Sequence, residues 1–160
     1  MKLKHEINIQ ASSNRAWKVL GEEFGSFSDW SSALSTSFVD GKLKVGSIRT
    51  CQLSGDFGPI KASTIKEQVI TYNPKGMTLE YEVILGLPKM MKKATNRWTI
   101  TAIDANNCRI RSEATITLRG PFKLLAPLIK LLMNTDLGIF YEELEFKVAN
   151  GYTQSSYVER

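Results

Sequence analysis

The sequence is poor in the residues that bind metals or act as nucleophiles, with two cysteines and one histidine among 160 residues. Cys51 and Cys108 do not have the spacing of metal ligands, and one histidine cannot form a histidine metal site alone. Both cysteines fall in predicted strands, where buried free thiols are the usual state. We therefore expect no metal site and no cofactor.

The sequence also lacks long apolar runs and clusters of one charge. No uninterrupted apolar run reaches the ~18 residues that a membrane span needs. The first ten residues, MKLKHEINIQ, alternate in polarity and do not resemble a signal peptide. The net charge of +5 is modest, and the lysines and arginines are scattered rather than grouped with aromatic residues. These absences predict a cytoplasmic protein that does not bind nucleic acid.

The remaining composition is ordinary for a globular protein, with 42% hydrophobic and 23% charged residues. A chain of this length is typical of one domain with a sizeable core. We expect a single domain over residues 1–150 and a flexible polar tail over residues 151–160.

The most apolar stretch, residues 121–149, predicts a long helix. Its apolar side chains recur every three to five residues, which is the spacing of one broad helical face. They are Leu125, Leu128, Ile129, Leu132, Met133, Leu137, Phe140, Leu144 and Val148. Pro121 suits a first turn and Gly151 a stop signal, whereas Pro127 is expected to bend or break the helix near its start. A helix this apolar needs a large surface to lie on.

The residues before this helix predict an antiparallel sheet. Alternating polarity marks a first strand over residues 3–9, and two short helical patterns follow at residues 16–20 and 27–34. Five strand-length stretches come next, at residues 45–53, 62–71, 77–85, 94–103 and 108–118, separated by turn residues at hairpin spacing. A short strand before Asp40 would be the seventh. The prediction is an α+β fold in which the long helix closes a curved sheet of six or seven strands over an apolar cavity.

Several short strings add a resemblance to this pattern. They are Ala16-Trp17 before Phe24-Gly25 and Trp30, Val45-Gly46-Ser47-Ile48-Arg49, Ile65-Lys66-Glu67-Gln68-Val69 before Tyr72-Asn73-Pro74, and Leu79-Glu80-Tyr81-Glu82-Val83 before Gly86-Leu87-Pro88. In this order they resemble the START-like, or Bet v 1-like, superfamily with the helix-grip fold, over about residues 2–149. Within it, the polyketide cyclase/dehydrase and lipid-transport group is the most similar.

The resemblance implies a protein that binds or carries a small hydrophobic ligand of lipid, polyketide or aromatic type. The alternative is an enzyme of the cyclase or dehydratase type, a lyase, acting on such a ligand. Ser31 stands where the group often has a proline, and the pocket lysine of the plant-hormone receptors in the superfamily has no counterpart that we can place. The particular ligand therefore stays open.

Strand alternation indicates which side chains face the cavity. In the last strand Ile110, Ser112, Ala114, Ile116 and Leu118 share a face, and its two small residues would leave space at the centre. The inward sets of the two strands before it are Tyr81, Val83 and Leu85, and Trp98, Ile100 and Ala102, with Asn96 at the rim. The predicted ligand-binding residues are Trp30, Arg49, Cys51, Glu67, Tyr81, Val83, Trp98, Ile100, Ser112, Ala114, Leu137 and Phe140. An ordinary packed core is the alternative.

Arg49 and Glu67 are the polar positions that matter most, because their strand neighbours on the same face are apolar. On adjacent hairpin strands both would point inward, and two charges in such a place should pair. A bidentate pair could orient the polar end of a ligand. The alternatives are a purely structural ion pair or a pair on the solvent face.

A catalyst would need an acid or base beside the ligand, and the candidates are Glu67, Arg49, Tyr81 and His5. His5 lies on the apolar face of the first strand, where a hydrogen-bonded or edge-exposed histidine is more typical than a catalytic one. No spacing ties two candidates together as a catalytic pair. We therefore favour binding or carrying over catalysis.

A last string, GLPKMMKK, places Met90 and Met91 beside lysines at a predicted hairpin tip. Methionines next to lysines suit transient contact with an anionic membrane, with residues 121–132 as neighbours. The alternative, slightly favoured, is that the methionines fold inward as a lid of the cavity. The protein is expected to be a monomer or a homodimer.

Overall fold

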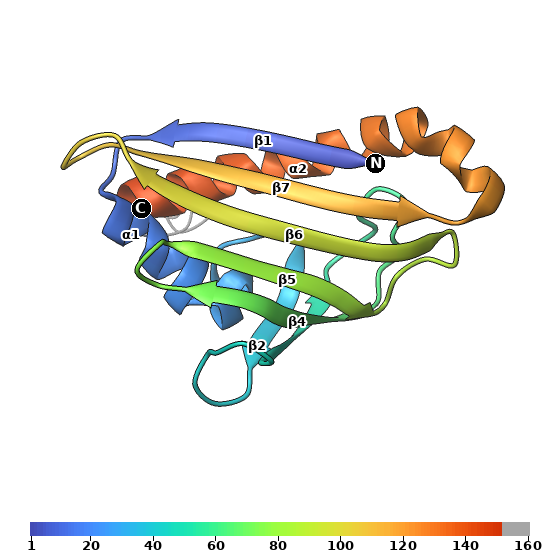
Figure 1. The fold of residues 1–160 in the computed structure, drawn as a ribbon, viewed down its shortest axis with the longest axis horizontal. Helices are drawn as coiled ribbons and strands as arrows, with labels where there is room; N and C mark the ends of the chain where they lie inside the picture. Colours follow the sequence, from blue (N-terminus) through green and yellow to red (C-terminus); the bar gives the residue numbers. More distant parts are fainter. Residues whose placement is uncertain (152–160) are drawn as a thin grey trace.

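The computed structural model of the protein describes residues 1–151, so the predicted tail lies almost entirely outside the described residues. The elements in chain order are β1 (Lys2–Ile9), α1 (Ser13–Trp17), η1 (Lys18–Glu22), η2 (Phe24–Asp29), β2 (Leu34–Val39), β3 (Ile48–Leu53), β4 (Thr64–Asn73), β5 (Thr78–Leu85), β6 (Met91–Ala102), β7 (Cys108–Leu118), η3 (Gly120–Leu125) and α2 (Ala126–Asn150). The strands form one antiparallel sheet in the order β1-β7-β6-β5-β4-β3-β2. Figure 1 shows α2 behind this sheet, with its first turns and η3 past the start of β1. The predicted α+β architecture with seven strands is confirmed.

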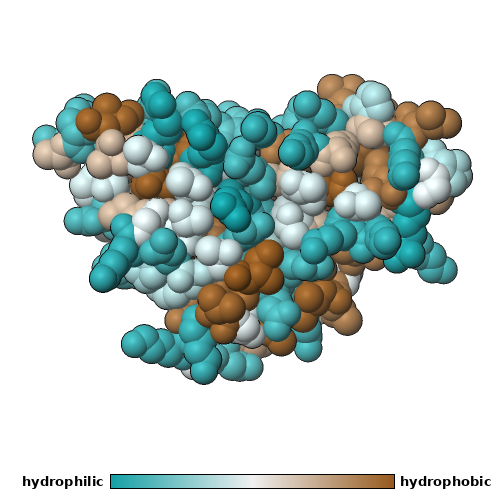
Figure 2. All heavy atoms as spheres, viewed as in Figure 1, coloured by the Kyte–Doolittle hydropathy of each residue, from teal (hydrophilic) through white to brown (hydrophobic). Residues whose placement is uncertain are grey.

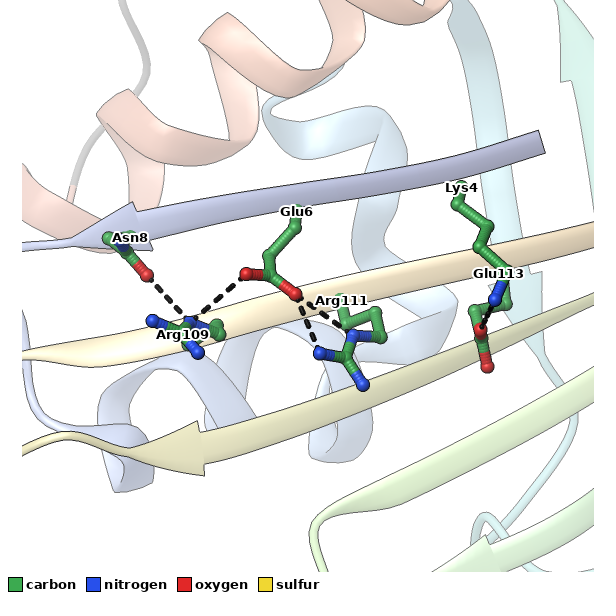
Figure 3. Close-up of polar contacts among 6 residues, drawn as sticks. All are labelled: Lys4, Glu6, Asn8, Arg109, Arg111 and Glu113. Carbon is green, nitrogen blue, oxygen red and sulfur yellow. Dashed lines mark hydrogen bonds and ion pairs between the residues drawn. The ribbon is translucent and has the colours of Figure 1, made fainter.

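Charged pairs fix the position of β1 on β7, on the face of the sheet opposite to the buried side chains (Figure 3). Lys4 lies opposite Glu113 and Glu6 opposite Arg111, with ion-pair distances of 3.0 Å and 2.7 Å. Arg109 also reaches Glu6, at 3.2 Å. Because a slip of one residue would turn every side chain of β1 to the other face, these pairs help to keep Leu3 inside.

The sheet curves where its pairing is irregular. The register of β4 on β5 shifts between Lys66 and Glu67 and again between Val69 and Thr71. Such bulges bend a strand and increase its twist. The concave side faces α2 and the short helices, and this geometry leaves room between sheet and helix.

The short helices match the prediction only in part. Ser12 caps α1 by accepting a hydrogen bond from the Arg15 N–H at 3.3 Å, and the helical turns continue through η1. The helix predicted over residues 27–34 is wrong, since a 3-10 helix, η2, ends at Asp29 and Leu34 already begins β2. Leu34 pairs with Leu53 of β3, so tertiary pairing in the sheet overrides the helical spacing of this stretch.

The long helix breaks where its proline predicts. The 3-10 turn η3 ends at Leu125, and α2 starts at Ala126 with Pro127 in its first turn, where a missing N–H costs nothing. At the other end Gly151 has φ +82° and donates its N–H to the Lys147 carbonyl at 2.8 Å. This left-handed cap is the stop signal that the glycine indicated.

One helix among the described residues, Gly120–Asn150, is long and apolar enough to cross a membrane by length and composition alone. The expectation from the sequence concerned uninterrupted apolar runs, whereas this helix qualifies on its average hydropathy. Lys123 and Lys130 interrupt the run of apolar letters without lowering its average much. Only 17% of the most apolar part of this helix is buried in the protein.

Two clusters of buried side chains lie between α2 and the sheet. The larger one contains Tyr141, Leu144 and Val148 of the helix, packed with the short helices and with the sheet at that end. The smaller one contains Ile129 and Met133 of the helix with Leu3, Met91, Ile116 and Leu118 of the sheet. The first half of α2 (residues 126–135) thus rests on the small cluster, and the second half (residues 136–150) on the large one.

Candidate ligand-binding cavity

A cavity of about 600 Å³ lies between the concave face of the sheet and α2. The inner face of β7 explains why it is there. Ile110 is buried in the large cluster and Leu118 in the small one, whereas Ser112 and Ala114 between them line the cavity. Two small side chains at mid-strand leave space that larger ones would fill, and the alternative of an ordinary packed core does not hold.

Most of the predicted ligand-binding residues line this cavity. They are Arg49, Glu67, Tyr81, Val83, Trp98, Ser112, Ala114, Leu137 and Phe140, together with Asn96. Each comes from the inward face of a strand or from the side of α2 that faces the sheet. The geometry brings them together from five strands and one helix.

Three predicted residues, Trp30, Cys51 and Ile100, are buried but do not line the cavity. Trp30 packs behind Phe140, with their ring centroids 5.2 Å apart. Ile100 belongs to the large cluster, and the Cys51 thiol lies 3.7 Å from the Ser37 hydroxyl of β2. Alternation finds the inner face of a strand but not how far the cavity extends along it.

Two other inward expectations are wrong, because Leu85 and Ala102 are exposed. Both stand at the last residue of their strands, beyond the part of the sheet that the helices cover.

Several lining residues were not predicted as ligand contacts. They are Leu3, His5, Phe27, Leu53, Phe57, Ile60, Ile65, Leu87, Met91, Ala94, Ile116, Met133 and Tyr141. Strand alternation could have added Leu3 and Ile116, and helical spacing from Leu137 could have added Met133 and Tyr141. Nothing in the sequence pattern indicated that the loop carrying Phe57 folds over the cavity. The inward fold of the string GLPKMMKK was the favoured alternative, and Leu87 and Met91 of this string line the cavity.

Arg49 and Glu67 are directly opposite each other on β3 and β4 and form a buried ion pair. Arg49 Nε and Nη2 lie 2.7 Å and 2.5 Å from the same oxygen, Glu67 Oε2. The side chains belong to residues only 4% and 9% exposed, so the pair is not on the solvent face. Glu67 Oε1 accepts no hydrogen bond from the described residues, and Glu67 lines the cavity.

Aromatic rings and a backbone carbonyl hold the guanidinium of Arg49 in place. Its Nη1 donates to the Phe24 carbonyl at 3.1 Å, and its carbon lies 3.9 Å and 4.4 Å from the ring centres of Phe24 and Phe27. Burial by itself lowers the pKa of Arg49, but the Glu67 carboxylate and other partners outweigh it and leave the pKa raised. The arginine is therefore charged at any physiological pH.

A row of hydrogen-bonded side chains crosses the cavity floor from the helix to β5, and we call it the polar row: Tyr141, Ser112, Asn96 and Tyr81. Ser112 Oγ donates to Asn96 Oδ1 at 2.8 Å, and Asn96 Nδ2 donates to the Tyr81 hydroxyl at 3.3 Å. Tyr141 is hydrogen-bonded to Ser112. Because the Tyr81 oxygen accepts from Asn96, Tyr81 keeps its own O–H free to donate.

The ionisation of the two tyrosines follows from their position. Burial, and next the negative charge of Glu67, raise the pKa of Tyr81 far above its usual value. Burial also raises the pKa of Tyr141. Both hydroxyls are protonated at neutral pH, so Tyr81 acts toward a ligand as a hydrogen-bond donor and not as a base.

His5 lies on β1 at the edge of the cavity and stacks flat on Tyr141 of α2. The ring centroids are 3.6 Å apart and the rings are 5° from parallel. Burial on this side lowers the pKa of His5 below 6.5, which keeps the imidazole neutral at pH 7. The residue therefore ties β1 to the second half of α2.

The cavity has two chemically different ends. The aromatic end, under the second half of α2, is made by Phe27, Tyr81, Trp98, Phe140 and Tyr141. The aliphatic end, under the first half, is made by Leu3, Leu87, Met91, Ile116 and Met133. Rigid rings and hydrogen-bonding groups are at one end, and flexible hydrocarbon and thioether groups are at the other.

The loop between β3 and β4 is attached to the helix over the aliphatic end. Gly58 donates its N–H to Asp136 Oδ2 at 2.6 Å. Gly58 has φ +54°, and a Cβ there would lie 2.8 Å from Met133 Cγ. Only glycine fits this approach, which holds Phe57 of the loop against the cavity.

The reactive groups outside the polar row are few. Cys51 and Cys108 are buried free thiols, as predicted, and burial raises the pKa of both. Within residues 1–151 no three histidine, cysteine, aspartate or glutamate side chains gather as metal ligands would. The chemistry that the cavity offers is therefore hydrogen bonding beside one buried ion pair.

The sequence matches the model of one known protein family over most of its length. Residues 1–145 match the model of the family described as polyketide cyclase / dehydrase and lipid transport. No curated protein sequence matches the chain.

Solved structures share the fold at low sequence identity. A START superfamily protein from Mycobacterium smegmatis has a TM-score of 0.74 at 14% identity, over 92% of this chain and 96% of that one. A norcoclaurine synthase point mutant from Thalictrum flavum has 0.71 at 19%, over 92% and 93%. An aromatase/cyclase from Streptomyces has 0.70 at 12%, over 94% and 97%. At such identities the likeness establishes the fold and no particular ligand.

Proposed function

Because the chain belongs to the polyketide cyclase / dehydrase and lipid transport family, we propose that it binds or carries a small, mostly apolar molecule in the cavity under α2. The observation that carries the proposal is the cavity itself, about 600 Å³ with apolar walls and one row of polar groups. Sites for drug-sized molecules typically measure ~300–1,000 Å³ and combine apolar walls with a few placed hydrogen-bonding groups.

The two ends of the cavity indicate the form of the ligand. A ring or ketone that accepts a hydrogen bond suits the aromatic end, where the Tyr81 O–H is free. A hydrocarbon part suits the aliphatic end. A ligand of lipid, polyketide or aromatic type with oxygen at one end meets both requirements, whereas a highly charged metabolite meets neither.

Native mass spectrometry of protein purified from cells tests the proposal directly. We expect an additional mass of lipid or polyketide size, released by organic solvent. In addition, an uncharged apolar fluorescent probe should change its emission when the purified protein binds it. A protein that carries no molecule and binds no apolar probe contradicts the proposal.

A second candidate function is a cyclase or dehydratase acting on such a ligand. The observation that favours it is that Glu67 Oε1 and the Tyr81 O–H border one cavity without other partners among the described residues. A carboxylate can take a proton from an enolisable carbon while the tyrosine donates a hydrogen bond to the carbonyl oxygen.

The substitution Glu67→Gln separates the two functions, since glutamine can still accept from Arg49 but cannot serve as a base. An enzyme should lose turnover and keep ligand affinity, and a carrier should show no turnover in either form. Thermal unfolding of the variant checks that the cavity persists.

Location and assembly stay predictions of the sequence. We propose a cytoplasmic protein that is a monomer or a homodimer, and light scattering after gel filtration measures the second property.

A further inference from the structure

The start of the C-terminal helical segment carries large apolar side chains that no part of residues 1–151 covers. They are Phe122, Leu124, Leu125, Leu128, Leu131 and Leu132, with exposures from 40% to 84%, and we call them the leucine face. Within residues 121–135 only Ile129 and Met133 are buried. Figure 2 shows hydrophobic surface at the upper right, where Figure 1 places η3 and the start of α2.

Such a surface is unusual for a protein that stands alone in water. A helix that is apolar on all sides is normally covered on all sides, and contiguous exposed apolar patches on monomers mark interaction sites. Here a single side of the segment is covered, by the small cluster of Ile129 and Met133. The leucine face is therefore a surface for a partner.

The charged side chains within the segment that carries the leucine face are all positive. Lys123 and Lys130 stand among the leucines, and residues 114–135 contain no carboxylate. The neighbouring loop carries Lys89, and Lys92 follows at the start of β6. The loop is joined to this segment because the Arg119 N–H donates to the Met90 carbonyl at 2.8 Å. In contrast, residues 136–150 contain four carboxylates and one lysine.

We propose that the leucine face docks on an anionic lipid bilayer, with the helix lying in the interface. Leucines can enter the acyl boundary while the long lysine side chains reach the phosphate groups. The leucine face offers apolar groups and positive charges, and anionic lipid supplies the hydrocarbon and the negative charge that complement them.

Two other occupants fit less well. A second copy of the chain, paired face to face about a twofold axis, would bring Lys123 and Lys130 of both copies together with no carboxylate between them. A membrane span would need the whole helix Gly120–Asn150, but its second half is packed on the sheet through Tyr141, Leu144 and Val148. The exposed residues 122–132 extend only about 16 Å at ~1.5 Å per residue, and the hydrocarbon core is about 30 Å thick. The segment lies on a bilayer and does not cross it.

The position of the leucine face beside the cavity gives the docking a purpose, which rests on the proposed ligand binding. Lys130 and Asn134 are exposed and also line the cavity, so the cavity reaches the surface at this place. Docking would set the aliphatic end against the lipid, and an apolar ligand could pass between bilayer and cavity without crossing water. The contact residues differ from Met90 and Met91, since Met91 is only 2% exposed and lines the cavity.

Co-sedimentation with vesicles tests the docking. The full chain should bind vesicles of phosphatidylcholine mixed with phosphatidylglycerol, bind phosphatidylcholine alone far less, and release in high salt.

Lys123→Gln with Lys130→Gln should weaken binding roughly thirtyfold, taking ~1 kcal/mol for each charge near the surface. Leu124→Gln with Leu131→Gln should abolish it. The matched control is Val45→Gln with Ile103→Gln, two exposed apolar residues elsewhere, which should bind as the parent chain does.

The same samples separate this inference from the proposed function. The leucine variant should still bind the uncharged apolar probe in the cavity, because Leu124 and Leu131 do not line it. Binding to anionic vesicles that survives the leucine substitutions, or no binding by the parent chain, overturns the docking while the cavity probe still reports on the cavity. A dimer seen by light scattering and lost in the leucine variant also overturns it and assigns the face to a second copy.

Discussion

The two halves of α2 have similar apolar content and opposite surroundings. The second half is held by Tyr141, Leu144 and Val148 in the large cluster, and its exposed side carries carboxylates. The first half buries only Ile129 and Met133 and exposes leucines and Lys130. The lesson is that the hydrophobicity of a helix does not say what covers it. The second half fastens the helix to the sheet, and the first half offers a surface.

The difference continues into the cavity below. Beneath the second half are the rings, the polar row and the ion pair of Arg49 and Glu67, and each of these groups is fixed by neighbours. Beneath the first half are aliphatic side chains and Met91 and Met133, which adapt easily to different shapes. We infer that orientation of a ligand is decided at the aromatic end and its passage at the aliphatic end.

The largest expected effect contrasts one leucine from each half. Leu144→Ala should lower the free energy of unfolding by about 2–5 kcal/mol, because Leu144 is fully buried and the change leaves a cavity. Leu131→Ala should change it by no more than about 0.5 kcal/mol. Urea denaturation followed by fluorescence measures both. Equal losses in the two variants would mean that the halves are packed alike.

A substitution at the boundary between the two ends should close the cavity without unfolding the protein. Ala114→Phe places a ring in the empty space, so affinity for an apolar probe should fall at least about tenfold, a difference of ~1.4 kcal/mol. Thr115→Phe on the same strand is the control, since Thr115 is exposed. Probe affinity that is unchanged by Ala114→Phe would show that the probe binds elsewhere.

A smaller effect tests whether the aromatic end orients the ligand. Tyr81→Phe removes the free O–H and should weaken a ligand with a carbonyl group by about 0.5–1.5 kcal/mol, while a pure hydrocarbon should bind as before. Tyr72→Phe is a fair control because Tyr72 does not line the cavity. Isothermal titration with the paired ligands gives the comparison, and equal weakening of both would assign Tyr81 to packing alone.

The smallest expected effect is on the pKa of His5, which lies at the contact between β1 and the second half of α2. His5 is the only histidine, so its ring resonances can be followed by NMR through a pH titration. The pKa should lie below 6.5, since burial disfavours the charged form. The unfolded chain then takes up the proton more readily, so the contribution of His5 to stability is fully present above pH 6.5 and is lost as the pH falls below it.

The same titration responds to loosening of the helix. In Leu144→Ala the second half of α2 should hold Tyr141 less firmly against His5, and the midpoint should return toward 6.5. A midpoint at 6.5 in the parent chain would contradict the stacked contact.

Much of this architecture could be predicted from the sequence, because local patterns set it. The strands and the long helix follow from periodicity, the break before Pro127 from its ring, and the inward pairing of Arg49 with Glu67 from alternation on neighbouring strands. The cavity itself could be predicted from Ser112 and Ala114 at mid-strand, together with the resemblance. These features depend on residues close in sequence or on one hairpin.

Other features could not be predicted because they depend on contacts distant in sequence. The stacking of His5 on Tyr141 joins β1 to the last helix, and alternation alone cannot say which helix residue it meets. The exclusion of Ile100 and Trp30 from the cavity reflects where the short helices fill the sheet. The serine-rich stretch read as a second helix shows the same limit, since tertiary packing decided between a helical turn and the strand that begins at Leu34.

The hydrogen bond from Gly58 to Asp136 has a mechanical consequence. It couples the loop between β3 and β4 to α2 at the junction of its two halves, next to Met133. Any outward movement of this part of α2 would therefore carry the loop and its Phe57 with it, away from the sheet. The Asp136 carboxylate would thus link contact between the helix and lipid to the position of a loop that lines the cavity.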